Sequence, residues 1–316
     1  MLQATKQVEA IPVRDGLKLS FSQRNLLFLL LLSCSIWILW TPIKIATSYS
    51  FWGEYESDRY FPTLVAPVLS LALIVLERRR IFSTVEWAVR PGTALLLLGA
   101  FLRILAGTTN HVTGSDFAMS VGVLGLVACE IGAFILCYGT RAFKTGQFPL
   151  LFLLASVPLP STLFDMLVSA VQTGSTEVCA FLFRLSGVPV LQNGMDFSLP
   201  DVTIRIEKAC SGIHSTLAII LVSLIATHLF LTSMWRKLVL VFFAIPVVCA
   251  SNGFRIAGLT LLAQYVDRDF LYGNLHRHGG VGFFILALLL LYLVLQLLKV
   301  GIPRTKLSAG SSASLL

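Results

Sequence analysis

Eight apolar stretches, each close to the length of a membrane span, constrain the fold of this chain more than any other feature. An α-helix needs roughly 20 apolar residues to cross the hydrocarbon core of a bilayer. Stretches that approach this length lie near residues 26–45, 61–76, 92–107, 117–138, 148–160, 211–232, 238–262 and 281–298. The sequence therefore predicts an all-α polytopic membrane protein with about eight transmembrane helices.

The composition excludes most other classes of protein. Hydrophobic residues make up 56% of the 316 residues and charged residues only 13%. A soluble globule needs more polar residues to cover its surface, and a disordered chain fails on the same figures. The six cysteines form no CxxC pair and no Cys/His cluster. We therefore expect no disulfide scaffold, no metal site and no cofactor.

The distribution of basic residues predicts the orientation of the chain. With the N-terminus inside, 15 of the 24 lysines and arginines fall in the predicted inner segments and 6 in the outer loops. This asymmetry follows the positive-inside rule and predicts that both termini are cytoplasmic. It also accounts for the net charge of +8 without a nucleic-acid partner. We expect a multi-pass protein of the cell inner (plasma) membrane, in contact with lipid.

The chain divides into four parts. We expect a cytoplasmic arm at residues 1–25, a four-helix membrane region at 26–147, a second membrane region at 148–298 and a cytoplasmic tail at 299–316. The second membrane region contains the features that suggest chemistry. It also contains a long outer loop, residues 158–209.

This outer loop is too polar to cross the membrane but is still patterned. Residues 190–207 have an Asn193-Gly194 turn signal and alternate Val202, Ile204 and Ile206 with polar residues, which predicts a small β-hairpin. The preceding part has apolar residues at helical spacing and predicts an amphipathic helix on the outer membrane face. Its apolar positions are Phe164, Leu167, Val168, Val171, Val178, Phe181, Leu182 and Leu185.

Cys210 stands where this hairpin meets the next span, in the run from Glu207 to Ser215. The positive end of a helix dipole and the nearby Lys208 both favour a thiolate, so this is a good position for a nucleophile. Ser211 is a supporting polar neighbour. The other five cysteines are expected to be ordinary small apolar residues of the membrane region.

Arg255 lies inside an otherwise apolar span, with Asn252 one turn earlier on the same helix face. An ionisable group within a span is costly and suggests a functional site. The alternative is that the arginine extends to the lipid headgroups. Its span runs outward, so Arg255 is predicted in the half nearer the outer face.

His276 and His278 precede the last span at its outer end, and imidazoles can exchange protons near neutral pH. The predicted topology brings Cys210, Arg255 and these histidines to one outer leaflet. A thiol, a fixed cation and an imidazole at one depth suggest cysteine acyl transfer. Two other classes stay open, namely a transporter and a non-catalytic membrane scaffold.

These residues resemble the exosortase/archaeosortase family of polytopic membrane cysteine transpeptidases. The family's A-C-S-G, N-x-x-R and H-x-x-x-G motifs are matched at residues 209–212, 252–255 and 276–280. His278 also satisfies the third motif through Gly282, but Gly280 and Phe283-Phe284 follow His276 at the family's spacing. The resemblance covers residues 148–298 and implies that they form the catalytic membrane region.

The resemblance implies an enzyme that processes sorting signals of the PEP-CTERM type at the C-termini of exported proteins. Such a signal has a short motif, a transmembrane helix and a basic tail. Cys210 would form a thioester, Arg255 would steady the oxyanion or the peptide, and His276 would move protons, with Asn252 orienting Arg255. The acceptor nucleophile is unknown, and the sequence does not separate transfer from hydrolysis.

Overall fold

The computed structural model describes residues 21–38, 55–113, 115–208, 212–268, 270 and 280–300. Most of these residues are helical, and a small three-stranded sheet is present. The prediction of an all-α membrane protein with a small β element is therefore confirmed. The helices long and apolar enough to cross a membrane number seven among the described residues: Asp58–Leu76, Val89–Thr108, Asp116–Thr145, Ser161–Ser186, Ile213–Phe230, Met234–Tyr265 and Gly280–Lys299.

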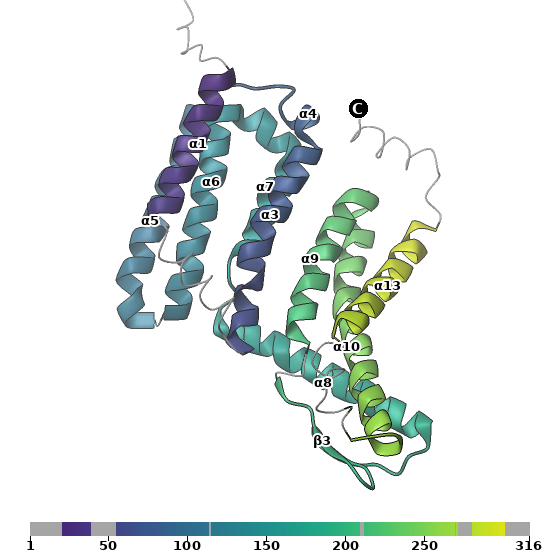
Figure 1. The fold of residues 1–316 in the computed structure, drawn as a ribbon. Helices are drawn as coiled ribbons and strands as arrows, with labels where there is room; N and C mark the ends of the chain where they lie inside the picture. Colours follow the sequence, from purple (N-terminus) through teal and green to yellow (C-terminus); the bar gives the residue numbers. More distant parts are fainter. Residues whose placement is uncertain are drawn as a thin grey trace, which may run out of the picture.

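The long helices run between two ends of the molecule (Figure 1). We call the end where the first described helix begins and the last one ends the upper end, and the opposite end the lower end. The first half of the chain comprises α1 (Phe21–Ile38), η1 (Tyr55–Tyr60), α3 (Phe61–Leu76), α4 (Arg78–Ile81), α5 (Val89–Thr113) and α6 (Ser115–Thr145). The helix predicted at 26–45 thus begins five residues earlier, at Phe21.

Helices α5 and α6 pack closely because glycines lie at their interface. A Cβ atom on Gly99 would come within 2.6 Å of the Gly125 carbonyl oxygen, and one on Gly132 within 2.9 Å of the Leu96 nitrogen. Small residues let helix backbones approach, which is a common basis of helix association in membranes. This pair makes the first half of the chain a compact helical unit.

The span predicted at residues 148–160 is only partly helical. It consists of α7 (Gln147–Phe152) and η2 (Leu153–Ser156), and the backbone is extended at Val157 and Pro160. Pro158 and Pro160 explain the end of the helix, since proline has no N–H and disfavours helical geometry in the residue before it. Ten helical and four extended residues cover about 28 Å. The segment therefore connects the upper and lower ends, but not as one continuous helix (Figure 1).

The extended part of this segment has hydrogen-bond partners within the protein. The Ser120 hydroxyl donates to the Pro158 carbonyl at 2.8 Å, and the Arg59 Nε donates to the Leu159 carbonyl. Irregular backbone at membrane depth is tolerated only where other groups satisfy it. These two bonds fix the segment beside η1 and the start of α6.

The outer loop contains α8 (Ser161–Ser186), which runs across the lower end of the molecule (Figure 1). The predicted amphipathic helix is present, and its apolar residues divide between buried and exposed positions. Phe164, Val168 and Val171 are buried, whereas Phe181 and Leu185 are exposed. In the second half of α8 the buried positions are Ser175, Thr176, Cys179, Ala180 and Phe183. The helix packs one face on α10 and leaves apolar residues on the other.

The predicted β-hairpin is part of a three-stranded antiparallel sheet. It contains β1 (Leu191–Asn193), β2 (Asp196–Ser198) and β3 (Thr203–Arg205), in the order β1-β2-β3. The Asn193-Gly194 turn joins the first two strands, as predicted, and Val202 and Ile206 are buried. The sheet covers the lower side of α8, with Phe197 packed on Phe183.

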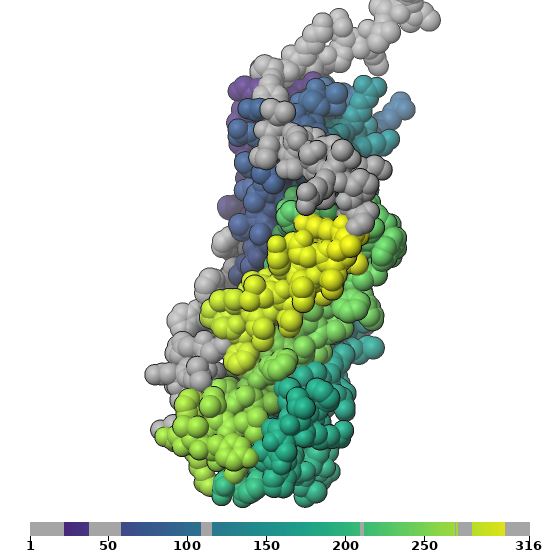
Figure 2. Space-filling view, turned by 90° about the vertical axis from the view of Figure 1, so that its right-hand side faces the viewer, coloured from purple at the N-terminus to yellow at the C-terminus, as the bar shows by residue number. Residues whose placement is uncertain are grey.

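The second half of the chain ends in three long helices, α9 (Ile213–Phe230), α10 (Met234–Tyr265) and α13 (Gly280–Lys299). Ala287, Leu291 and Leu295 of α13 join one core cluster with Ile219 of α9 and Val248 of α10. Figure 2 shows α13 lying over the other two helices, and the end of α10 beside the segment that contains α8 and the sheet.

The first half of the chain meets the second where α3 contacts α7 and η2 and where α3 and α9 lie side by side. Ala66 of α3, Phe152 of α7 and Leu221 of α9 form a shared buried cluster. Both α3 and α9 run from the lower to the upper end, so they are parallel neighbours (Figure 1). Through these contacts the position of α3 can affect the position of α9.

Candidate active site

The candidate site lies at the lower end, where α9 begins against the middle of α10. Gly212 precedes α9 with φ 72° and ψ 28°, a left-handed conformation that favours glycine. A Cβ atom on Gly212 would come within 3.3 Å of the Asn252 Oδ1. Both the backbone conformation and the closeness of Asn252 therefore require glycine at the fourth position of the A-C-S-G motif.

Asn252 is held by α8. Its side chain is 5% exposed, and its Nδ2 donates to the Ser175 hydroxyl at 3.1 Å. The next residue, Gly253, allows α10 to approach α8 so closely that a Cβ atom there would lie 2.5 Å from Val178 Cγ1. The Cys179 thiol also donates to the Gly253 carbonyl. These contacts with α8 fix the position of Asn252 and Gly253 in the N-x-x-R motif.

A small pocket of about 30 Å³ lies beside this motif. Its wall includes the half-buried Arg255 guanidinium, the Asn252 amide and the hydroxyls of Ser215 and Ser251. An arginine carries five N–H donors and an amide carries two, whereas the single O–H of Ser251 is already given to the Phe283 carbonyl. The full lining is Gly212, Ser215, Val248, Ser251, Asn252, Arg255, Gly280, Phe283, Phe284 and Ala287. Such a wall suits a carbonyl oxygen that gains negative charge during a reaction.

The first turn of α13 closes the pocket on one side. The Ser251 hydroxyl donates to the Phe283 carbonyl at 2.5 Å, which ties α13 to α10. Phe283 and Phe284 supply the apolar part of the wall, and Gly280 begins the helix at the pocket edge. The segment that contains the H-x-x-x-G motif therefore ends at this pocket.

The chain that leads to the A-C-S-G motif is anchored by α8 and α10. The Gln172 side chain is buried and donates through Nε2 to the Ile206 carbonyl at 2.6 Å. Ile206 itself is buried, and its N–H donates to the Met195 carbonyl. The Gln264 side chain makes two hydrogen bonds with Asp201, at 2.6 and 3.1 Å. The sheet is thereby fixed beside the end of α10.

The structure brings together two of the residues predicted from sequence. Arg255 and Asn252 line the same pocket, as their spacing suggested. Cys210, Ser211, His276 and His278 lie outside the described residues. No group of three or more His, Cys, Asp or Glu side chains that could hold a metal occurs in the part of the chain that the structure describes.

Sequence patterns did not identify Gln172, Ser175, Ser215 and Ser251 as site residues. Ser175 could have been identified, because Gly174 and Ser175 interrupt the apolar pattern of α8 with small residues. A Cβ atom on Gly174 would come within 2.6 Å of the Cys249 sulfur. Paired small residues on two membrane helices indicate close packing. Nothing in the local sequence identifies Gln172 as the anchor of the strand.

Comparison with protein families gives one match. The family model described as "Transmembrane exosortase (Exosortase_EpsH)" matches residues 52–293. No curated protein and no solved structure matches the chain. The family match begins just before η1 and includes every element that lines the pocket.

Proposed function

Since this chain belongs to the transmembrane exosortase family, we propose that it cleaves the C-terminal anchor of exported proteins by cysteine chemistry. Membership supports the general role of a membrane transpeptidase. The finer proposal is that Cys210 attacks a peptide bond at the outer face of the cell inner membrane. The cleaved protein then passes to an acceptor nucleophile.

One observation carries this proposal: all three motifs border on a single pocket. Gly212, Asn252, Arg255 and Gly280 line it together. Consecutive Cα atoms are about 3.8 Å apart, so Cys210 lies within about 8 Å of Gly212 and His276 within about 15 Å of Gly280. Chain connectivity therefore limits how far Cys210 and His276 can lie from the pocket, which supports the proposal that their side chains act there.

The chemistry follows from the residue types. The Cys210 thiolate attacks the scissile carbonyl carbon, and the oxygen that becomes negative is stabilised by donors such as Arg255. The C–N bond then breaks, and the protonated His276 gives its proton to the leaving amine. A thioester remains. An acceptor amine or water attacks it and gives its proton to the now neutral His276, the C–S bond breaks, and the thiolate and the protonated imidazole are restored.

The substrate that fits this arrangement is itself anchored in the membrane. A substrate with a short motif, a transmembrane helix and a basic tail is confined to two dimensions and presents its scissile bond at a fixed depth. The pocket lies where α9 and α13 begin, beside the middle of α10. Both α9 and α13 finish at the upper end (Figure 1). With both termini cytoplasmic, the pocket faces the exterior or periplasm.

Two replacements of Cys210 test the nucleophile. Cys210→Ala should insert and fold normally but lose cleavage of an anchored substrate in membranes. Cys210→Ser should be almost as inactive, because an alcohol ionises far less than a thiol. The measurement is the fraction of substrate converted at matched enzyme levels. Near wild-type cleavage by Cys210→Ala would show that the nucleophile lies elsewhere.

Thiol labelling supplies a test that needs no substrate. With Cys34 replaced by alanine in both proteins, because Cys34 is exposed, a water-soluble alkylating reagent should label the protein with Cys210 much faster than the one with Cys210→Ala. Cys137, Cys179 and Cys249 are buried and serve as an internal background. Equal labelling of both proteins would favour a transporter or a scaffold over an enzyme.

A further inference from the structure

Two histidine–carboxylate pairs join the first half of the chain to α9, one at each end of the helix. His214 in the first turn of α9 pairs with Asp58 of η1, and His228 in its last turn pairs with Glu77 at the end of α3. Both pairs join a histidine of α9 to a carboxylate next to one end of α3. They differ in their distance from the candidate active site.

The lower pair is formed by His214 and Asp58. The His214 Nδ1 lies 2.9 Å from the Asp58 Oδ1, and the imidazole ring contacts Phe61 with ring centroids 4.1 Å apart. The side chains are 55% and 27% exposed, respectively. The contact thus joins α9 to both η1 and the first residue of α3.

Asp58 is held in place by its neighbour. Arg59 is 7% exposed, and its Nη1 lies 2.8 Å from the Asp116 Oδ2 at the start of α6. Its Nε donates to the Leu159 carbonyl just before α8. η1 is therefore anchored to α6 and to the extended segment, so Asp58 offers His214 a fixed partner.

His214 stands beside the residues that form the pocket. Gly212 and Ser215 line that pocket, and His214 lies between them in the chain. Cys210 precedes His214 by four residues. A side chain that holds the first turn of α9 also limits how Gly212 can lie against Asn252.

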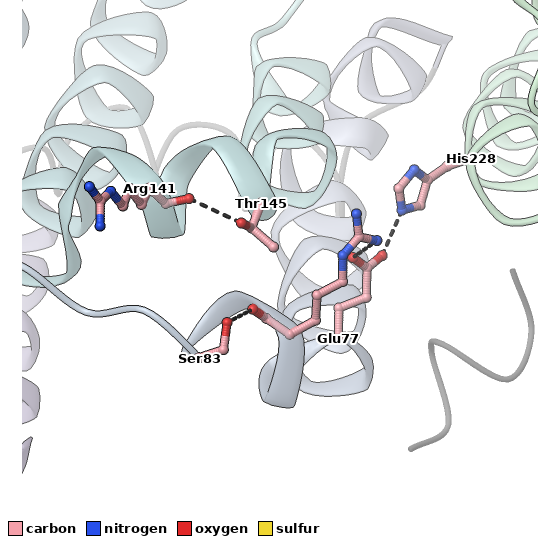
Figure 3. A network of polar contacts seen from close by, with 6 residues as sticks. Glu77, Ser83, Arg141, Thr145 and His228 are labelled. Carbon is pink, nitrogen blue, oxygen red and sulfur yellow. Dashed lines mark hydrogen bonds and ion pairs between the residues drawn. The ribbon is translucent and has the colours of Figure 1, made fainter. Parts of the chain in front are cut away.

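The upper pair provides a comparison within the same molecule. The His228 Nε2 lies 2.6 Å from the Glu77 Oε1 (Figure 3). The imidazole ring stacks on Phe148 with centroids 3.9 Å apart. The side chains are 21% and 6% exposed, so this pair is the more buried of the two. Fourteen residues of helix place it about 21 Å from His214.

We propose that Asp58 and His214 are positioning residues for the nucleophile, a role that rests on the proposed function of Cys210. The pair fixes the first turn of α9 on η1, and this contact aligns Cys210 with the Arg255 pocket. The first half of the chain thereby takes part in catalysis without touching the substrate. His228 and Glu77 hold the same two halves together but have no such role.

The two pairs allow a matched test of this idea. His214→Ala should lower kcat for an anchored substrate about tenfold and leave KM within about twofold, the scale expected for one hydrogen bond to a charged group. His228→Ala should leave kcat per folded molecule within about twofold. It should lower the unfolding midpoint in detergent more than His214→Ala does, because it leaves the Glu77 carboxylate buried without its partner.

Conservative variants separate positioning from loss of structure. His214→Gln keeps a donor for Asp58, and Asp58→Asn keeps an acceptor for His214, so each should retain kcat within about threefold of wild type. Asp58→Ala should resemble His214→Ala. The rate of Cys210 alkylation by a small water-soluble reagent should change at least threefold in both alanine variants and stay unchanged in His228→Ala.

Several results would overturn the positioning role. These are equal losses of kcat in His214→Ala and His228→Ala, a loss confined to KM, an unchanged alkylation rate in His214→Ala, or no recovery in the conservative variants. Failure of the proposed function would look different, because Cys210→Ala would then still cleave the substrate. The alkylation comparison would still test whether the pair controls Cys210.

Discussion

Replacing Gly253 with alanine is the sharpest test of how packing sets up the candidate site. Gly253 follows Asn252 directly and faces α8. The added Cβ atom would lie 2.5 Å from Val178 Cγ1 and 2.6 Å from Val178 Cβ, whereas carbon atoms in contact prefer about 3.5–4.0 Å. Valine is stiff at χ1, so its side chain cannot simply rotate away. Helix α8 must move by roughly 1 Å.

The expected loss of stability is the balance of three effects. Overpacking costs about 1–3 kcal/mol. Stretching the 3.1 Å hydrogen bond from Asn252 to Ser175 removes about 1 kcal/mol more. Alanine returns about 1 kcal/mol through its higher helix propensity. We therefore expect Gly253→Ala to destabilise the protein by roughly 1–3 kcal/mol.

The effect on activity should exceed the effect on folding. A displacement of 1 Å can lower the rate of an enzyme about a hundredfold, and Asn252 and Arg255 would both be displaced from the pocket. We expect cleavage of an anchored substrate to fall at least tenfold per folded molecule. Reversible unfolding in mixed detergent micelles would measure the stability change in parallel.

Gly258→Ala is the matched control for this prediction. Gly258 lies in the same helix, and a Cβ atom there would meet nothing within 4 Å. This variant should be as stable as wild type or slightly more stable, with cleavage within about twofold. If Gly253→Ala matched Gly258→Ala in both measurements, the close packing of α8 and α10 would not be what positions the site.

Four further predictions concern the pocket arginine, the two histidines, the anchor of the sheet and the orientation of the chain. Arg255→Lys should lose activity despite keeping its charge, because an ammonium lacks the planar fork of donors. His276→Ala should slow cleavage far more than His278→Ala, and the opposite order would move the proton-transfer role to His278. Gln172→Ala should cost about 1–3 kcal/mol by leaving the buried Ile206 carbonyl without its donor, measured by unfolding in detergent, and an unchanged stability would remove Gln172 as the anchor of the sheet. Reporter fusions should read external near Asn193 and Asn274 and cytoplasmic at Arg79, Arg141 and Lys237. An inward-facing Asn193 would contradict the proposed orientation.

Much of the architecture could be predicted because hydropathy and residue periodicity are local signals. Apolar stretches of span length located most of the helices, and alternation in residues 202–207 correctly gave the buried side of β3. The motif spacing also identified Asn252 and Arg255 as neighbours on one helix face. Each of these inferences depends on a single element, so no knowledge of its packing partners was needed.

Sequence patterns did not show which side chains of α8 pack against another helix. In α8, Phe181 and Leu185 fit the predicted apolar face but are exposed, while Ser175 and Cys179 are buried against α10. Lipid is as apolar as a protein core, so hydropathy cannot distinguish a lipid-facing side chain from one at a helix interface. Close backbone approach selects small residues there instead.

The sequence by itself thus determined that this chain crosses a membrane many times, and it predicts that the chemistry belongs near the A-C-S-G, N-x-x-R and H-x-x-x-G motifs. Only the tertiary structure decided that the helix after Gly146 ends at Ser156, that Ser175 holds Asn252, and that His214 pairs with Asp58. Asp58 and His214 lie 156 residues apart in the chain. Such a contact depends on how α3 and α9 pack side by side, and local residue patterns carry no information about that packing.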